Sequence, residues 1–146
     1  MKKLVALLLL TAVFVPGWAQ KVKIKKEVVT VDGVEYALFQ KDPIVRSGKV
    51  IKNTQGGVLL NMVLRHYTDP NAVTQSNPKG NVYYYEVTDP TSREIYFEYG
   101  GGFKALFKSF YAANVIKDDG SLDLESLKTI ATRFGNEYSR KRSDPK

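Results

Sequence analysis

The first two thirds of the chain alternate between apolar and polar residues, a pattern typical of β-strands joined by short turns. The clearest hairpin signal is Asp32-Gly33, a pair that favours a two-residue turn. Such a turn places Val29 opposite Tyr36. Continued alternation would put Lys23 and Lys25 on the apolar face, so we expect a β-bulge near residues 25–27 that corrects the phase. Strands are predicted at 28–31, 34–39, 44–46, 49–52, 58–67, 82–88 and 93–99.

The last predicted hairpin carries most of the aromatic residues. Residues 89–92 are expected to form a type I turn that joins its two strands. The resulting register sets Tyr84 beside Phe97 and assigns both to the core face of the sheet. The loop 68–80 is the longest in the prediction, and long loops are where functional residues often lie.

After the glycines 100–102 the apolar period changes from two to 3.6, which indicates helices. Asp123 is expected to cap a second helix that ends at Gly135, and 136–146 is expected to be a frayed basic tail. The apolar stripe of the first helix comprises Phe103, Leu106, Phe107, Phe110 and Tyr111. The whole pattern predicts an α+β domain over 20–135. It is an antiparallel β-meander of about six strands, followed by two C-terminal α-helices packed on one face.

Residues 1–19 have the features of a secretory signal peptide: two lysines, an apolar run over 4–15 and small residues at Gly17 and Ala19. We expect cleavage after Ala19. The apolar run is well short of the roughly 20 residues that a membrane-spanning helix needs, and no later segment is long enough either. The absence of cysteine excludes an acylated lipoprotein. The expected location is therefore periplasmic or secreted.

Composition excludes several classes of chemistry. The 146-residue chain has no cysteine and one histidine, His66, so disulfides, zinc ribbons, iron–sulfur clusters and thiol nucleophiles are excluded, and no cofactor is expected. The net charge of +7 falls to +5 without residues 1–19. The basic residues cluster at the two ends of the mature chain, which leaves contact with anionic lipid or polysaccharide as a weaker option. Nucleic acid is not an expected partner of an exported protein.

Two stretches resemble a known group of sequences. They are K-V-K-I-K-K-E-V-V-T-V-D-G-V-E-Y, from residue 21, and N-V-I-K-D-D-G-S-L-D-L-E-S-L, from residue 114. Together with the signal peptide they are similar to uncharacterised small exported proteins of Bacteroidetes-type bacteria. The resemblance implies a periplasmic or secreted α+β protein of unassigned activity. It rests on hairpin and helix-cap residues, so it implies no functional residue.

The best candidate site is a row of tyrosines. Tyr83 and Tyr85 are expected to point away from the core face and to meet Tyr96 across the last hairpin. A tyrosine has a flat apolar ring and a polar tip, so an exposed row could stack on sugars or on a partner's side chains. The alternatives are that these rings only stabilise the sheet, or that helices cover their face.

A second, weaker candidate is an anion nest at Gly101, Gly102 and Lys104, where glycines precede a helix as they do in dinucleotide-binding folds. A nucleotide-binding site is rejected here, because no strand follows this helix to complete a parallel βαβ unit. The segment 118–123 resembles a calcium loop but lacks three of the ligand positions. No metal site is predicted.

A catalytic interpretation finds little support. His66 has no partner histidine or thiol, and Glu94 and Glu98 lie about 13 Å apart along one strand, beyond the separation of paired catalytic carboxylates. We therefore expect a non-catalytic binding protein of the bacterial envelope, with a protein or glycan partner. The alternatives are a small hydrolase of envelope glycans, whose carboxylates the fold would bring together, and a protective protein of the immunity or inhibitor type.

Overall fold

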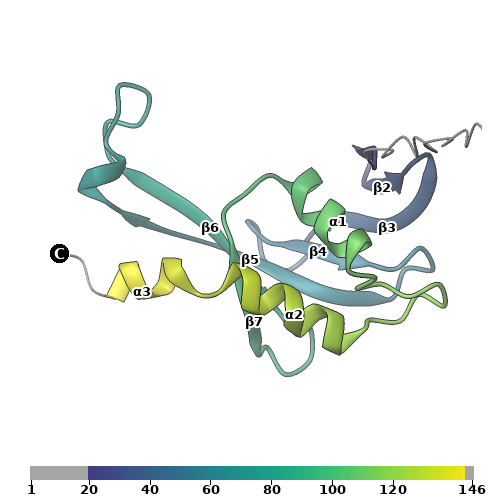
Figure 1. Cartoon of the computed structure of the whole chain (residues 1–146). Coiled ribbons are helices and arrows are strands. Elements are labelled where there is room, and N and C mark those ends of the chain that lie inside the picture. The colour runs from purple at the N-terminus through teal and green to yellow at the C-terminus, as the bar shows by residue number, and fades with distance from the viewer. Residues whose placement is uncertain (1–19, 144–146) are drawn as a thin grey trace, which may run out of the picture.

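A computed structural model describes residues 20–143, so the expected signal peptide lies outside the described residues. The seven strands form a single antiparallel sheet in which each strand pairs with the next along the chain. This arrangement is the predicted meander (Figure 1). The strands are β1 (Val22–Lys25), β2 (Val28–Val31), β3 (Val34–Lys41), β4 (Lys49–Lys52), β5 (Val58–Thr68), β6 (Asn81–Thr88) and β7 (Ile95–Tyr99).

The N-terminal segment differs from the prediction because it contains a second tight turn. Lys26 and Glu27 have φ angles of 49° and 69°, so they form the turn between β1 and β2 although neither is a typical turn residue. The bulge expected at this point is instead a register shift between Val29 and Thr30. Val29 consequently pairs with Ala37 rather than with Tyr36. Residues 44–46, predicted as a strand, lie in the irregular connection between β3 and β4.

The register predicted for the last hairpin was wrong. Residues 89–94 form a longer connection than the expected four-residue turn, and a further register shift lies between Val87 and Thr88. Tyr85 therefore pairs with Tyr99 and Val87 with Phe97. Because side chains alternate between the two faces of a strand, this odd-numbered slip moves Tyr84 to the face opposite Phe97.

The hydrophobic core lies between the sheet and two helices, α1 (Phe103–Ala112) and α2 (Leu124–Phe134), as predicted. Leu106, Phe107 and Phe110 of α1 are fully buried. Phe107 packs on Phe39 of β3 and on Phe110, with ring centroids 5.3 and 6.2 Å apart. The middle of the predicted helical stripe thus fills the space above the sheet, whereas Tyr111 at its end is 41% exposed. Within residues 20–143 no helix is long and apolar enough to cross a bilayer.

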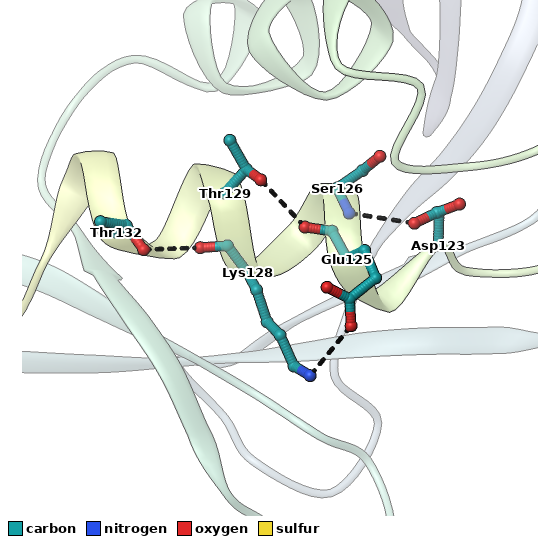
Figure 2. A network of polar contacts seen from close by, with 6 residues as sticks. All are labelled: Asp123, Glu125, Ser126, Lys128, Thr129 and Thr132. Carbon is teal, nitrogen blue, oxygen red and sulfur yellow. Dashed lines mark hydrogen bonds and ion pairs between the residues drawn. The ribbon is translucent and has the colours of Figure 1, made fainter.

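Asp123 and Gly135 bound α2 as expected. The Asp123 carboxylate accepts a hydrogen bond of 2.9 Å from the backbone N–H of Ser126 (Figure 2). Gly135 ends the helix with a φ of 68°. Along the exposed side of α2, Lys128 pairs with Glu125 at 3.2 Å. These contacts fix where the helix begins and ends, and they leave the chain heading back along β7.

The predicted frayed tail is a third helix as far as it is described. Helix α3 (Glu137–Ser143) begins two residues after Gly135, and Figure 1 shows it continuing along the sheet beyond α2. The ring of Tyr138 stacks on Tyr84 at 5.0 Å and 8°, and the Ser139 N–H donates to Glu98. Helix α3 thus covers part of the sheet face opposite α1, and residues that the prediction left outside the domain belong to it.

Candidate functional site

The most prominent feature outside the core is a two-stranded ribbon that projects from the sheet (Figure 1). β4 pairs only with 58–62 of β5, and β7 pairs only with 85–88 of β6. Residues 65–68 and 81–84 therefore pair with one another and with no other strand. We call these segments and the loop 69–80 that joins them the β5–β6 ribbon. Both of its edges lie beyond the body of the sheet, and the face that carries Tyr84 is partly covered by α3.

The loop at the tip of the ribbon is held by its own hydrogen bonds. The Asn77 side-chain amide donates to the carbonyl oxygens of Ala72 and Asn81, each at 3.0 Å. Asp69 caps the short 3-10 helix Pro70–Ala72. Gly80 has a φ of 64°, and a side chain there would overlap the Asp69 carbonyl oxygen. A loop with this many internal contacts presents a fixed surface.

Of the three predicted tyrosines, Tyr83 lies on the ribbon. Its side chain is 56% exposed and lies against His66 of β5, with ring centroids 5.7 Å apart and planes 30° apart. His66 is exposed as well. The two rings form a stacked aromatic pair on the face of the ribbon that continues the helix-covered face of the sheet. We call it the His66–Tyr83 pair.

The other two tyrosines do not extend this pair into a row. Tyr85 is on the same face of β6 as Tyr83, but it is partly buried against Phe103 of α1, with centroids 5.5 Å apart. Tyr96 lies near the far end of the β6–β7 hairpin, about 15 Å of strand from Tyr83. Its hydroxyl donates to the Asp89 carboxylate at 3.2 Å. The structure thus exposes Tyr83 and separates Tyr96 from it.

The electrostatics at Tyr96 reflect this position. Burial, followed by the hydrogen bond to Asp89, raises the pKa of the Tyr96 hydroxyl. The backbone N–H groups of Ser92 and Thr91 lower the pKa of Asp89, because they donate to its carboxylate. Asp89 is thus the cap of the β6–β7 turn. Its contact with Tyr96 serves the turn, not an exposed binding surface.

The residues of the predicted anion nest have other roles in the fold. Gly102 is the N-cap of α1 with an extended backbone, and its carbonyl oxygen accepts a hydrogen bond of 2.8 Å from the Tyr99 hydroxyl. None of Gly100, Gly101 and Gly102 has the positive φ that a nest of alternating helical handedness requires. A side chain at Gly101 would overlap the Tyr99 ring. Lys104 is an exposed residue in the first turn of α1.

A polar cluster that the sequence analysis did not assemble lies on the opposite face of the sheet. Glu86 and Glu98 are directly opposite one another on β6 and β7 and are only 5% and 2% exposed. Side chains in such a pair have Cβ atoms about 4.5–5.5 Å apart. The Arg65 guanidinium donates to Glu86 at 2.9 Å, and the Ser139 N–H donates to Glu98 at 2.9 Å. We call Glu86 and Glu98 the buried glutamate pair.

Tyr84 completes this cluster. It follows the same face of β6 as Glu86 and is fully buried between Tyr67 and Tyr138. Its hydroxyl has no hydrogen-bond partner among the described residues. The sequence analysis compared Glu98 only with Glu94 on the same strand. The pairing of Glu98 with Glu86 could have been predicted only from the correct register of β6 and β7.

No protein-family model, curated protein or solved structure matches this chain. Across residues 20–143, no three His, Asp or Glu side chains are grouped so that they could hold a metal ion.

Proposed function

We propose that this protein is a non-catalytic, exported binding protein of the bacterial envelope, and that the β5–β6 ribbon contacts a protein partner. The observation that carries the proposal is the exposed His66–Tyr83 pair on a ribbon with no neighbouring strand. Aromatic rings contribute large contact areas at low cost in conformational entropy, and they are enriched at protein interfaces. The export part of the proposal rests on residues 1–19.

The rigidity of the ribbon supports this use. An interaction arm that is ordered before it meets its partner loses less conformational entropy on binding than a mobile loop does. The loop 69–80 is fixed by the Asn77 and Asp69 side chains, so the aromatic pair and the tip are presented together. An inhibitor or immunity protein would use the same kind of surface, and it is one form of this proposal.

One observation supports the hydrolase alternative, and another opposes it. The buried glutamate pair has the short separation that paired catalytic carboxylates need, which the prediction did not anticipate. However, both carboxylates are almost fully buried, and each already accepts a hydrogen bond from Arg65 or from Ser139. A glycosidic bond could reach neither of them while α3 is in place. The geometry therefore favours binding.

Site-specific photo-crosslinking tests the proposal. A benzophenone-bearing phenylalanine replaces Tyr83 in the full-length chain expressed in its host, and the same residue replaces Leu124 in a control. Leu124 is 50% exposed, close to the 56% of Tyr83, but it lies on the first turn of α2. We expect a discrete protease-sensitive adduct from position 83 that position 124 does not give. Identical adduct patterns from both positions, none from position 83, or a protease-resistant glycan adduct there would refute the protein partner.

A further inference from the structure

A cavity of about 490 Å³ lies at the end of β5 opposite the ribbon. It opens between the β2–β3 hairpin, the turn that follows β4 and the connection from α1 to α2. Its volume is in the range of small-ligand sites, which extends from about 300 to 1,000 Å³. The ribbon begins roughly 25 Å of strand away along β5, so the cavity is a separate feature.

The walls of the cavity are fixed to one another by side chains. The Asn53 amide donates to the carbonyl oxygen of Gly120 at 3.1 Å, which joins the turn after β4 to the α1–α2 connection. The same side chain accepts a hydrogen bond of 2.8 Å from the Gly57 N–H. Within the connection, Ile116 and Leu122 form an isolated antiparallel bridge. The cavity is therefore formed before any ligand arrives.

Tyr36 of β3 forms part of the cavity wall. Its hydroxyl oxygen is buried, so a ligand in the cavity does not reach it. Burial raises the pKa of this hydroxyl to about 12, and the Ile116 N–H offsets only part of that effect. Tyr36 therefore gives the cavity an uncharged wall.

Tyr111 of α1 supplies an apolar surface beside this hydroxyl. Its ring meets Tyr36 edge to face at 5.3 Å and 75°, and the side chain is 41% exposed. Asn114, which adopts a left-handed φ of 54°, follows on the same rim. The cavity thus joins one aromatic surface to several groups that form hydrogen bonds.

The charges at the cavity favour neutral or cationic ligands. Glu35 and Asp118 contribute two exposed carboxylates to the lining. Lys117 is the one cationic residue in that lining, and its ammonium group pairs with Asp123 at 3.3 Å. Two free carboxylates beside one neutralised lysine repel an anion and attract a cation.

We propose that this cavity binds a single neutral or amino-bearing sugar unit. The apolar face of the sugar ring packs on Tyr111, and its hydroxyl groups pair with the Asn114 side chain and with the carboxylates of Glu35 and Asp118. Carboxylates form the stronger, charge-assisted hydrogen bonds with hydroxyl donors, which gives such a site its orientation. This inference is independent of the protein partner proposed for the ribbon, because it uses none of the ribbon's residues.

Three probes that differ in one group test the inference: glucosamine, glucose and glucuronate. Each is titrated into the chain without residues 1–19 and followed by two-dimensional amide NMR. We expect dissociation constants on the order of 1–10 mM for glucosamine and glucose, the usual range for a single sugar of this size. Glucuronate should bind at least about threefold more weakly. The shifted amides should be those of Glu35, Tyr36 and residues 111–118.

Two surface variants provide the matched control. Tyr111→Ala and Ile95→Ala each remove a side chain that is 41% or 46% exposed, so both variants should fold. Only Tyr111 lines the cavity, so only Tyr111→Ala should weaken sugar binding, by about two- to tenfold for the lost ring contact. Absence of binding at about 50 mM of every probe, preference for glucuronate, or equal binding by Tyr111→Ala and the wild type would each overturn the inference.

Discussion

Gly100→Ala should detach α3 from the sheet. The cause is a steric overlap and not the backbone conformation of residue 100. Gly100 does not have a positive φ, so alanine fits its backbone. A Cβ atom there would nevertheless overlap the hydroxyl and the ring of Tyr138. Tyr138 can then no longer stack on Tyr84 as it does now, with nearly parallel planes 5.0 Å apart.

The size of the effect follows from the contacts that α3 makes. A stacked aromatic pair contributes about 0.5–1.5 kcal/mol beyond its buried area. A hydrogen bond to a charged group, such as that from the Ser139 N–H to Glu98, contributes about 1.5–3 kcal/mol. The restriction that alanine places on the unfolded chain affects global unfolding and not the local release of α3. We expect a loss of roughly 2–4.5 kcal/mol in the free energy that holds α3 in place.

Amide hydrogen exchange measures this directly. The amides of 137–143, and that of Ser139 in particular, should exchange roughly 30- to 2,000-fold faster in Gly100→Ala, while those of β5 should not change. Gly102→Ala is the control, because a Cβ atom there would meet no atom within 4 Å. It should leave α3 as protected as in the wild type. Unchanged exchange at Ser139 in Gly100→Ala would refute the reasoning.

Two further predictions concern buried ionisable groups. Because the pKa of Tyr36 is raised from 10.0 to about 12, its contribution to stability is complete below pH 10 and is lost as the pH rises toward 12. The unfolding free energy of the wild type should fall more steeply over that interval than that of Tyr36→Phe, and equal slopes in urea titrations would contradict this. Arg65→Met should cost about 2–4 kcal/mol in urea unfolding, because it leaves Glu86 buried without its cation. Adding Glu86→Gln to Arg65→Met should restore most of the lost stability. If Arg65→Met alone is as stable as the wild type, the stabilising role of the Arg65–Glu86 ion pair is refuted.

Local sequence signals predicted the parts of the fold that depend on neighbouring residues. Asp32-Gly33 set the hairpin between β2 and β3, and Asp123 and Gly135 set both ends of α2. The change of period after Gly102 marked the passage from sheet to helix. In each case the residue acts on a backbone only a few positions away, so the sequence contains the whole cause.

The prediction was wrong where the cause is distant in sequence. Lys26 and Glu27 form a tight turn without glycine or asparagine, because strand pairing on both sides requires it. α3 has no apolar stripe, and what places it on the sheet is the contact of Tyr138 with Tyr84. The separation of Tyr96 from Tyr83 depends on the register of β6 and β7, which follows from the length of the connection between them.

The glycines before α1 have a packing role in place of the phosphate-binding role that their spacing suggested. Their spacing suggested a backbone that approaches a phosphate. In the structure, Gly100 and Gly101 instead leave room for the Tyr138 and Tyr99 side chains. Tyr99 then bonds to the Gly102 carbonyl oxygen and fixes the start of α1. The absence of side chains is used by the protein's own aromatic residues, so the motif has a complete structural explanation.

The buried glutamate pair, α3 and the ribbon form one connected unit. A carboxylate taken out of water costs several kcal/mol unless charged or hydrogen-bonding groups replace its hydration. Arg65 at the base of the ribbon provides that replacement for Glu86, and the backbone of α3 provides it for Glu98. Moving either element would leave a carboxylate uncompensated, so the pair holds the ribbon and α3 against the sheet. A group with that structural task is poorly suited to proton transfer, and this is the physical reason for favouring a binding surface at the ribbon over a reaction beneath α3.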